Sequence, residues 1–222
     1  MTASFTMKFL SPALILMGLA TALFAEDAGK PAPTILKLPV RVHLMQSATT
    51  PAMQTTLTEP DIRRIFAKVN MVWAPAGIQL QIESIGPSQA VELNEEQRFL
   101  PEYDKVGAMI PQDRLSATAI NVCYVKEVSP NGFYNGKLIV VKDTAALKEV
   151  AGGLDEPLPR VTSHEIGHAL GLPHRQDTTN LMQSGTTGYS LNESEIATTR
   201  ENAQERLQKA RPPEAAPNPP PP

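Results

Sequence analysis

One stretch, from His164 to His174, constrains this chain more than any other. It reads His-Glu-Ile-Gly-His-Ala-Leu-Gly-Leu-Pro-His and holds three of the chain's 4 histidines. On a helix, His164 and His168 lie one above the other, because residues i and i+4 share a face. Gly171 can adopt the positive φ that ends a helix and turns the chain back, which would bring His174 toward the same point. Three neutral imidazoles with an open fourth position predict a catalytic zinc site.

Glu165 follows the first of these histidines and lies one step around the predicted helix, beside the open coordination position. A carboxylate there can accept a proton from a bound water, so we predict that Glu165 is catalytic. The alternative is an ordinary amphipathic helix that carries surface histidines. The length of the motif argues against that alternative, because so many matched positions rarely arise by accident.

The pattern His164-Glu165-x-x-His168-x-x-Gly171-x-x-His174 resembles the zinc-binding motif of the metzincin metallopeptidases. These enzymes also have a methionine turn below the metal, and Asn180-Leu181-Met182 resembles it. The resemblance implies one catalytic zinc ion held by the three histidines, with Met182 beneath them as a hydrophobic floor and not as a ligand. It implies an α+β zincin fold, with a mixed twisted sheet of about four to five strands, an active-site helix and a C-terminal helix.

Matrixins and adamalysins are the nearest subfamilies, but the subfamily stays unassigned. Astacin- and serralysin-like enzymes place a tyrosine ligand two residues after the turn methionine, where this chain has Ser184. Arg175 follows the third histidine, at a position where the subfamilies carry characteristic residues. The substrate, an extra zinc ligand and a calcium requirement are left open.

The implied chemistry is hydrolysis of a peptide bond by a zinc-activated water, with Glu165 as general base. Two alternatives remain. One is a peptidase of narrow specificity that acts on one partner protein or on cell-wall peptide. The other is a catalytically silent exported binding domain on the same fold. The intact Glu165 and the full histidine set favour an enzyme, since a silent descendant has no need of the base.

Composition limits the partners that this chain can have. Its formal net charge of −3 indicates neither nucleic-acid binding nor attraction to anionic lipid. The resemblance to metzincins implies a protein or peptide substrate. We expect no stable membrane association after processing and, by default, a monomer. Cys123 is the sole cysteine and lies in the apolar run 120–125, which predicts a buried structural thiol and excludes a disulfide within the chain.

The first 25 residues have the layout of a signal peptide. Lys8 is the only charge before Glu26, and an apolar run ends in small residues that suit signal peptidase, such as Ala25. The sequence therefore predicts a secreted or periplasmic protein, with an uncleaved membrane anchor as the alternative. We expect a linker over 26–37, one catalytic domain over 38–209 and a disordered Pro-rich tail over 210–222.

Hydrophobic periodicity predicts the elements within that domain. Thr58 is the expected N-cap of a helix whose apolar stripe ends at Trp73, and Ser190 with Glu193 is the expected capping box of the last helix. His43 fits the outward face of its strand and is interpreted as structural. The expected strands are 38–45, 78–83, 118–128 and 138–141. The expected loops are 49–57, 86–117 with one or two helical turns, and 129–136. A short helix is expected over 143–153.

In metzincins, a strand before the active-site helix forms the sheet edge beside the cleft, and an extended substrate pairs with it. Residues 132–134 are candidates for lining such a cleft here. An ordinary surface hairpin explains the same residues equally well, so both interpretations stay open.

Overall fold

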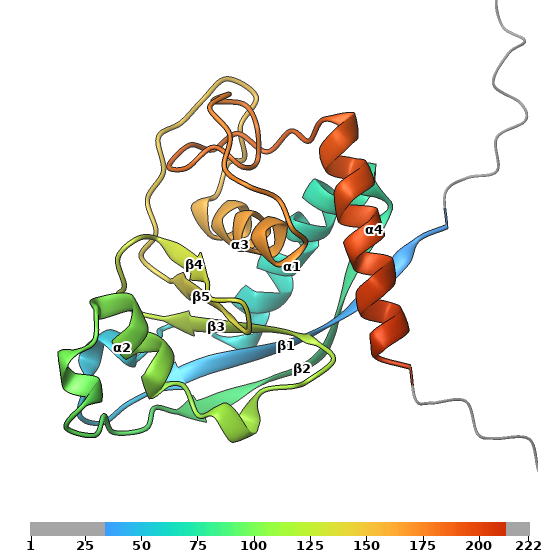
Figure 1. Ribbon diagram of the computed structural model, residues 1–222. Helices are drawn as coiled ribbons and strands as arrows, with labels where there is room; N and C mark the ends of the chain where they lie inside the picture. Colours follow the sequence, from blue (N-terminus) through green and yellow to red (C-terminus); the bar gives the residue numbers. More distant parts are fainter. Residues whose placement is uncertain (1–33, 212–222) are drawn as a thin grey trace, which may run out of the picture. The chain divides into compact units, whose positions relative to one another are not determined.

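The computed structural model describes residues 34–211, and its strands form one mixed sheet in the order β2-β1-β3-β5-β4 (Figure 1). β1 (Leu36–Gln46), β2 (Ile78–Gln89), β3 (Ile120–Val125) and β5 (Ile139–Lys142) are parallel neighbours, and β4 (Gly132–Tyr134) runs antiparallel to β5 at one edge. The α+β class predicted from the sequence is therefore confirmed. The helices are α1 (Glu59–Trp73), α2 (Glu102–Met109), α3 (Pro157–Ala169) and α4 (Glu193–Lys209), with short 3-10 turns η1 (Pro51–Met53), η2 (Ala74–Ala76), η3 (Gln97–Phe99) and η4 (Gln112–Arg114).

Apolar side chains cover both faces of the sheet, and β3 is buried throughout. Such a strand reads as a continuous apolar run because neither face meets water. Val122 and Tyr124 point into the main core with α1 and α3, whereas Cys123 and Val125 point into a second core with α2. Burial raises the pKa of the Cys123 thiol far above its ordinary value, as expected for a structural cysteine.

The active-site helix α3 is held against α1 and the sheet by specific polar contacts. The Tyr124 hydroxyl lies 2.8 Å from Oγ1 of Thr162, within the core. At the start of α3, Glu156 pairs with Arg64 and, at 3.1 Å, with Nζ of Lys68, both on α1. α1 itself begins at the predicted Thr58 cap and buries its whole predicted stripe, so both helices are placed as the sequence indicated.

The segment 143–153 is not the helix that the sequence predicted. The amide of Lys148 donates to the Gly185 carbonyl (2.8 Å), and the amide of Thr187 donates to the Lys148 carbonyl (3.0 Å). The Leu154 amide also donates to the Thr187 carbonyl at 2.8 Å. A helix would need the same main-chain groups for its i→i−4 bonds, so pairing with the distant 185–187 loop replaces it.

The cap of α4 also differs from the predicted pair of Ser190 and Glu193. The amide of Glu195 donates to Oδ1 of Asn192 (3.0 Å), and the Asn192 amide donates to Oε2 of Glu195 (2.9 Å). Ser190 instead donates its amide and its hydroxyl to the Thr179 carbonyl. The predicted capping box lies two residues too early in the sequence, because Ser190 makes its hydrogen bonds to the preceding loop and not to α4.

His43 does not face solvent as expected. Its side of the sheet carries the second core, and the residue is only 9% exposed. Burial lowers the pKa of its imidazole, and Nε2 lies 3.5 Å from Oδ1 of Asn121. The structural interpretation of His43 survives, since it lies outside the histidine cluster described below.

Several strand boundaries also differ from prediction, and β3 is shorter than the predicted 118–128, since it runs only from Ile120 to Val125. β1 begins at Leu36 and not at 38, and β2 continues to Gln89 because it keeps pairing with β1 beyond the predicted end at 83. The predicted loop 129–136 contains the edge strand β4.

Within residues 34–211, no helix is long and apolar enough to cross a membrane. The predicted signal peptide (1–25), most of the linker and nearly all of the tail lie outside the described residues and stay predictions.

Candidate metal centre and active site

The end of α3 brings the three predicted histidines together. The helix stops at Leu170, and Gly171 takes φ +86°, as the sequence predicted for the turn. The Leu172 amide donates to the Gly167 carbonyl (2.9 Å) and the Gly171 amide to the His168 carbonyl (3.0 Å), which is a Schellman motif. This reversal directs the following chain, with His174, back over the face of α3.

Backbone carbonyls fix the tautomers of two of these histidines. Nδ1 of His164 lies 2.8 Å from the Leu181 carbonyl, and Nδ1 of His168 lies 2.8 Å from the Leu172 carbonyl. A carbonyl oxygen can only accept, so each Nδ1 carries the proton and each Nε2 presents a lone pair. Burial lowers the pKa of His164 to about 3 and also lowers that of His168, which keeps both rings neutral.

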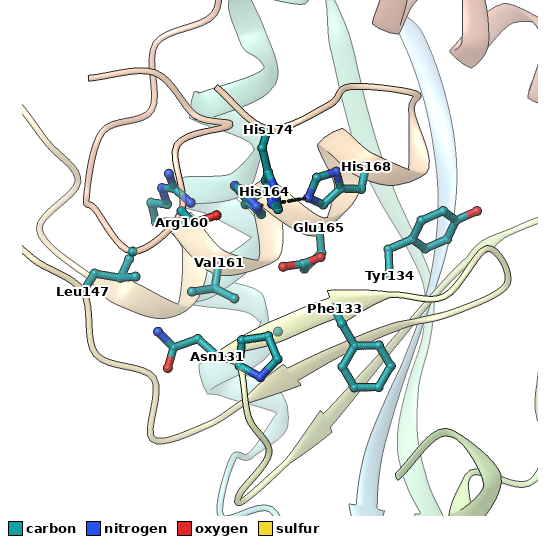
Figure 2. Close-up of a pocket in the computed structure, with 14 residues that line it drawn as sticks. Asn131, Phe133, Tyr134, Leu147, Arg160, Val161, His164, Glu165, His168 and His174 are labelled. Carbon is teal, nitrogen blue, oxygen red and sulfur yellow. Dashed lines mark hydrogen bonds between the residues drawn. The ribbon is translucent and has the colours of Figure 1, made fainter. Parts of the chain in front are cut away.

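The three Nε2 atoms converge on one point (Figure 2). Nε2 of His168 lies 3.1 Å from Nε2 of His164 and 3.1 Å from Nε2 of His174. The His164 and His168 lone pairs would repel each other at that distance, unless a shared cation lies between them. Tetrahedral ligands about 2.0–2.1 Å from a zinc ion are roughly 3.3 Å apart, so this donor set fits zinc.

Glu165 lies beside this cluster and is 5% exposed (Figure 2). Burial raises the pKa of its carboxyl to about 8, and the nearby Arg160 guanidinium partly opposes this effect. A Cβ built on Gly132 would lie 3.1 Å from Cγ of Glu165 and 2.8 Å from Cγ1 of Val161. The absence of a side chain at Gly132 therefore lets β4 approach the catalytic helix closely.

Met182 lies below the helix that carries the first two histidines. It is fully buried, and a Cβ built on Gly167 would lie only 2.5 Å from its sulfur. Its amide donates to Oδ1 of Asn180 (2.7 Å), which fixes the turn that the sequence likened to a methionine turn. The preceding Leu181 carbonyl accepts the His164 proton, so this turn also orients a candidate ligand.

Glu195 on α4 contacts residues on both sides of the site, and the sequence analysis did not identify it. Its Oε2 accepts from Nδ2 of Asn180 (2.8 Å), and its Oε1 accepts from Nε of Arg175 (2.9 Å). One buried carboxylate thus joins the methionine turn to the residue after His174. Arg175 accordingly has a structural contact in this chain. The Asn-x-x-Glu spacing that ends at Glu195 was the signal that could have revealed this residue.

Arg160 was also missed, although it lies one helical turn before His164. It is 1% exposed, and its Nε donates to the Gly188 carbonyl (2.8 Å) while its terminal nitrogen donates to the Gln183 carbonyl. The guanidinium therefore holds the loop after Met182 against α3. The available signal was the position of this arginine four residues before His164, on the same face of the predicted helix.

A cleft of about 530 Å³ lies against the three histidines, Glu165 and Arg160. β4 lies on one side of it and α3 on the other (Figure 2). Residues 132–134 therefore line the cleft, which settles the choice that the sequence left open, and Ser184 lines it too. The lining residues are Pro130, Asn131, Gly132, Phe133, Tyr134, Leu147, Arg160, Val161, His164, Glu165, His168, His174, Ser184 and Gly185.

Comparison with known proteins identifies similarity in the same region. The family model described as matrixin matches residues 111–206, which include α3, Met182 and most of α4. No curated protein matches the sequence. Archaemetzincin from Methanopyrus kandleri is 14% identical, with 80% of this chain and 98% of that one covered and a TM-score of 0.42. Metalloproteinase-II from Bacteroides fragilis is 15% identical, with 78% and 55% covered and a TM-score of 0.44.

Proposed function

We propose that the metzincin-like zinc peptidase domain of this chain acts as an exported endopeptidase that cleaves peptide bonds with Glu165 as general base. The observation that carries the proposal is the convergence of three Nε2 atoms beside a buried carboxylate in one cleft. The donor set suits zinc, and the carboxylate lies where a proton must be accepted. A binding domain would have no chemical use for that carboxylate.

His164, His168 and His174 would hold the metal through their Nε2 atoms. When bound, zinc supplies Lewis acidity, which polarises the scissile carbonyl and lowers the pKa of a coordinated water. The Leu181 and Leu172 carbonyls keep His164 and His168 in the ligating tautomer. The backbone therefore prepares the site before any metal arrives.

Glu165 would accept the proton of the attacking water and pass it to the leaving amine. Its burial raises the pKa of the carboxyl to about 8, so it holds a proton well enough to act as the later acid. Beside the positive charge of a bound cation, Glu165 would lose its proton more readily and start the cycle as a base.

The free edge of β4 would align the substrate. The Lys142 amide donates to the Asn131 carbonyl (2.8 Å), and the Asn135 amide donates to the Leu138 carbonyl (3.2 Å). Main-chain groups alternate in direction along an antiparallel strand, so those of Gly132 and Tyr134 point away from β5. An extended peptide could pair with them and pass Glu165 without needing a chain end, as an endopeptidase requires.

Substitution of Glu165 by Gln tests the proposal. The variant should bind as much zinc as the native protein, while hydrolysis of a denatured protein substrate falls by about 10²–10⁴-fold, because the general base is lost. Glu205→Gln is a matched control, since Glu205 is a surface residue of α4 that pairs with Lys209. Native-rate hydrolysis by a zinc-loaded Glu165→Gln protein would overturn the assigned role.

Export is part of the proposal and rests on the sequence pattern of residues 1–25. N-terminal sequencing of protein from the periplasm or medium should begin shortly after Ala22 or Ala25. A full-length chain retained in the membrane fraction would favour the uncleaved anchor.

A further inference from the structure

An aromatic pair lies on the face of β4 that points away from the histidines. The rings of Tyr103 and Phe133 meet edge to face, with centroids 5.9 Å apart and an interplanar angle of 70°. Figure 2 shows Phe133 directed to the opposite side of β4 from Glu165. Tyr103 is 47% exposed, so the pair is accessible from outside the protein.

Packing fixes this pair in place. Tyr103 belongs to α2, whose Val106 and Met109 are buried in the second core, where Phe133 also packs. Gly107 of the same helix approaches Asn135, which directly follows β4: a Cβ on that glycine would lie 3.5 Å from Nδ2 of the asparagine. The aromatic rings are thus anchored by their own elements and are not part of a free loop.

The segment that leads into Tyr103 also exposes apolar side chains. Phe99 and Leu100 shortly precede α2 in the sequence, and Phe99 is 89% exposed, although both are large hydrophobic residues. Exposed apolar residues that are grouped mark interaction sites more often than single exposed ones do. The exposed carboxylate of Glu102 lies 4.0 Å from Nζ of Lys105, so it is paired with a charge of opposite sign.

The alternation of a β-strand connects this pair to the substrate. A peptide that pairs with the free edge of β4 places each side chain on the same face as the residue directly opposite it. The peptide residue opposite Gly132 would face α3 and Glu165. Its neighbour, opposite Phe133, would therefore point to the other face, where Tyr103 lies.

We propose that Tyr103 and Phe133 form an aromatic shelf that binds a large apolar side chain of the substrate, one residue along from the residue that faces Glu165. This assignment rests on the proposed function, because it takes β4 as the strand that pairs with substrate. The shelf would select substrates by the side chain that points away from the metal. It therefore extends the specificity-determining surface from Phe133, at the cleft wall, to Tyr103, which does not line the cleft.

The test measures binding, so that it does not depend on hydrolysis. Fluorescein-labelled polyalanine peptides with terminal lysines carry one Phe, which is moved one position at a time, and their affinity for the zinc-loaded Glu165→Gln full chain is measured. We expect Phe to raise the affinity over Ala by about two- to tenfold at one position of the peptide. Adding Tyr103→Ala to the Glu165→Gln protein should abolish this increase at that position. The two neighbouring positions should be unaffected, since their side chains face α3.

Two further variants control for folding and for general surface effects. Tyr103→Phe keeps the ring and should retain the gain. Met71→Ala removes an apolar side chain that is 68% exposed on α1, away from the cleft, and should change no position. The shelf is refuted if Phe improves binding at no position, or if Tyr103→Ala weakens all positions equally or none.

Hydrolysis of the same peptides by the chain with Glu165 intact separates the two proposals. Position-specific binding that depends on Tyr103, without any cleavage, would reject the peptidase and keep the shelf. Cleavage whose rate is insensitive to Tyr103→Ala at every Phe position would keep the peptidase and reject the shelf.

Discussion

Substitution of Gly132 by Ala should damage catalysis by crowding the wall of the cleft. The added methyl carbon would lie 2.8 Å from Cγ1 of Val161, 3.0 Å from the Val140 carbonyl oxygen and 3.1 Å from Cγ of Glu165. Ordinary contacts between non-bonded carbons are about 3.5–4.0 Å. The Val140 carbonyl belongs to β5, inside the sheet, and cannot yield. Either β4 must therefore move outward or Glu165 must shift.

Two opposing effects set the change in the free energy of unfolding that Gly132→Ala should cause. Overpacking of this kind costs about 1–3 kcal/mol, and replacing a strand glycine by alanine returns about 0.5–1 kcal/mol of backbone entropy. The net loss of up to about 2.5 kcal/mol should lower Tm by up to roughly 10 °C for a domain of this size. A shift of the general base by about 1 Å can cost about 10²-fold in rate, so kcat/KM should fall by roughly 10- to 100-fold.

Thermal unfolding and kcat/KM of the zinc-loaded variant measure both effects. Gly86→Ala is a matched control, because Gly86 also lies in a strand but a methyl group added there would have no heavy atom within 4 Å. That control should keep native activity and an unchanged or slightly higher Tm. A Gly132→Ala protein with native Tm and native kcat/KM would refute the reasoning that β4 and Glu165 are in tight contact.

Two further predictions concern the turn after α3 and the catalytic carboxyl. Gly171→Ala forces a side chain into φ +86° and to within 2.6 Å of Nδ2 of Asn202, so stability should fall by about 1–2 kcal/mol or more and zinc affinity should weaken, as urea unfolding and zinc titration would show. Native zinc affinity would contradict this. In metal-free protein, Glu165 keeps its proton up to a pKa of about 8, whereas the unfolded chain loses it near 4.5. This carboxyl makes the folded state bind one more proton, so its own contribution to stability falls as pH rises from about 4.5 to about 8. Below about 6.5 the lowered pKa values of His43, His164 and His168 act in the opposite direction, because the folded state binds fewer protons at these rings. Urea unfolding of the native protein and of Glu165→Gln isolates the carboxyl: the stability of the native protein relative to the variant should fall as pH rises from about 4.5 to about 8, and a difference that stays constant would contradict the assigned burial effect.

Local spacing explains why much of the site was predictable from the sequence. His164 and His168 share a helix face by geometry alone, and the turn at Gly171 needs only a residue that tolerates positive φ. The buried stripe of α1 likewise follows from a period of 3.6 residues. In each case the decisive information lies within a few residues of the element itself.

Contacts between distant segments decided the features that the sequence did not reveal. β4 is three residues long and exists because it pairs with β5, so no periodic pattern announces it. The segment 143–153 contains helix-forming residues, yet its main chain bonds to the 185–187 loop. The roles of Arg160 and Glu195 depend on hydrogen bonds to carbonyls and side chains that are distant in the sequence. Such partners become known only when the fold is known.

Zinc titration of metal-free protein tests the proposed peptidase activity most directly. Hydrolysis of a denatured protein substrate should be absent without metal, rise in proportion to added zinc and stop rising at one zinc ion per chain. Hydrolysis that persists in the presence of a strong chelator would contradict the account. So would a protein that binds one zinc ion through these histidines and cleaves no peptide bond.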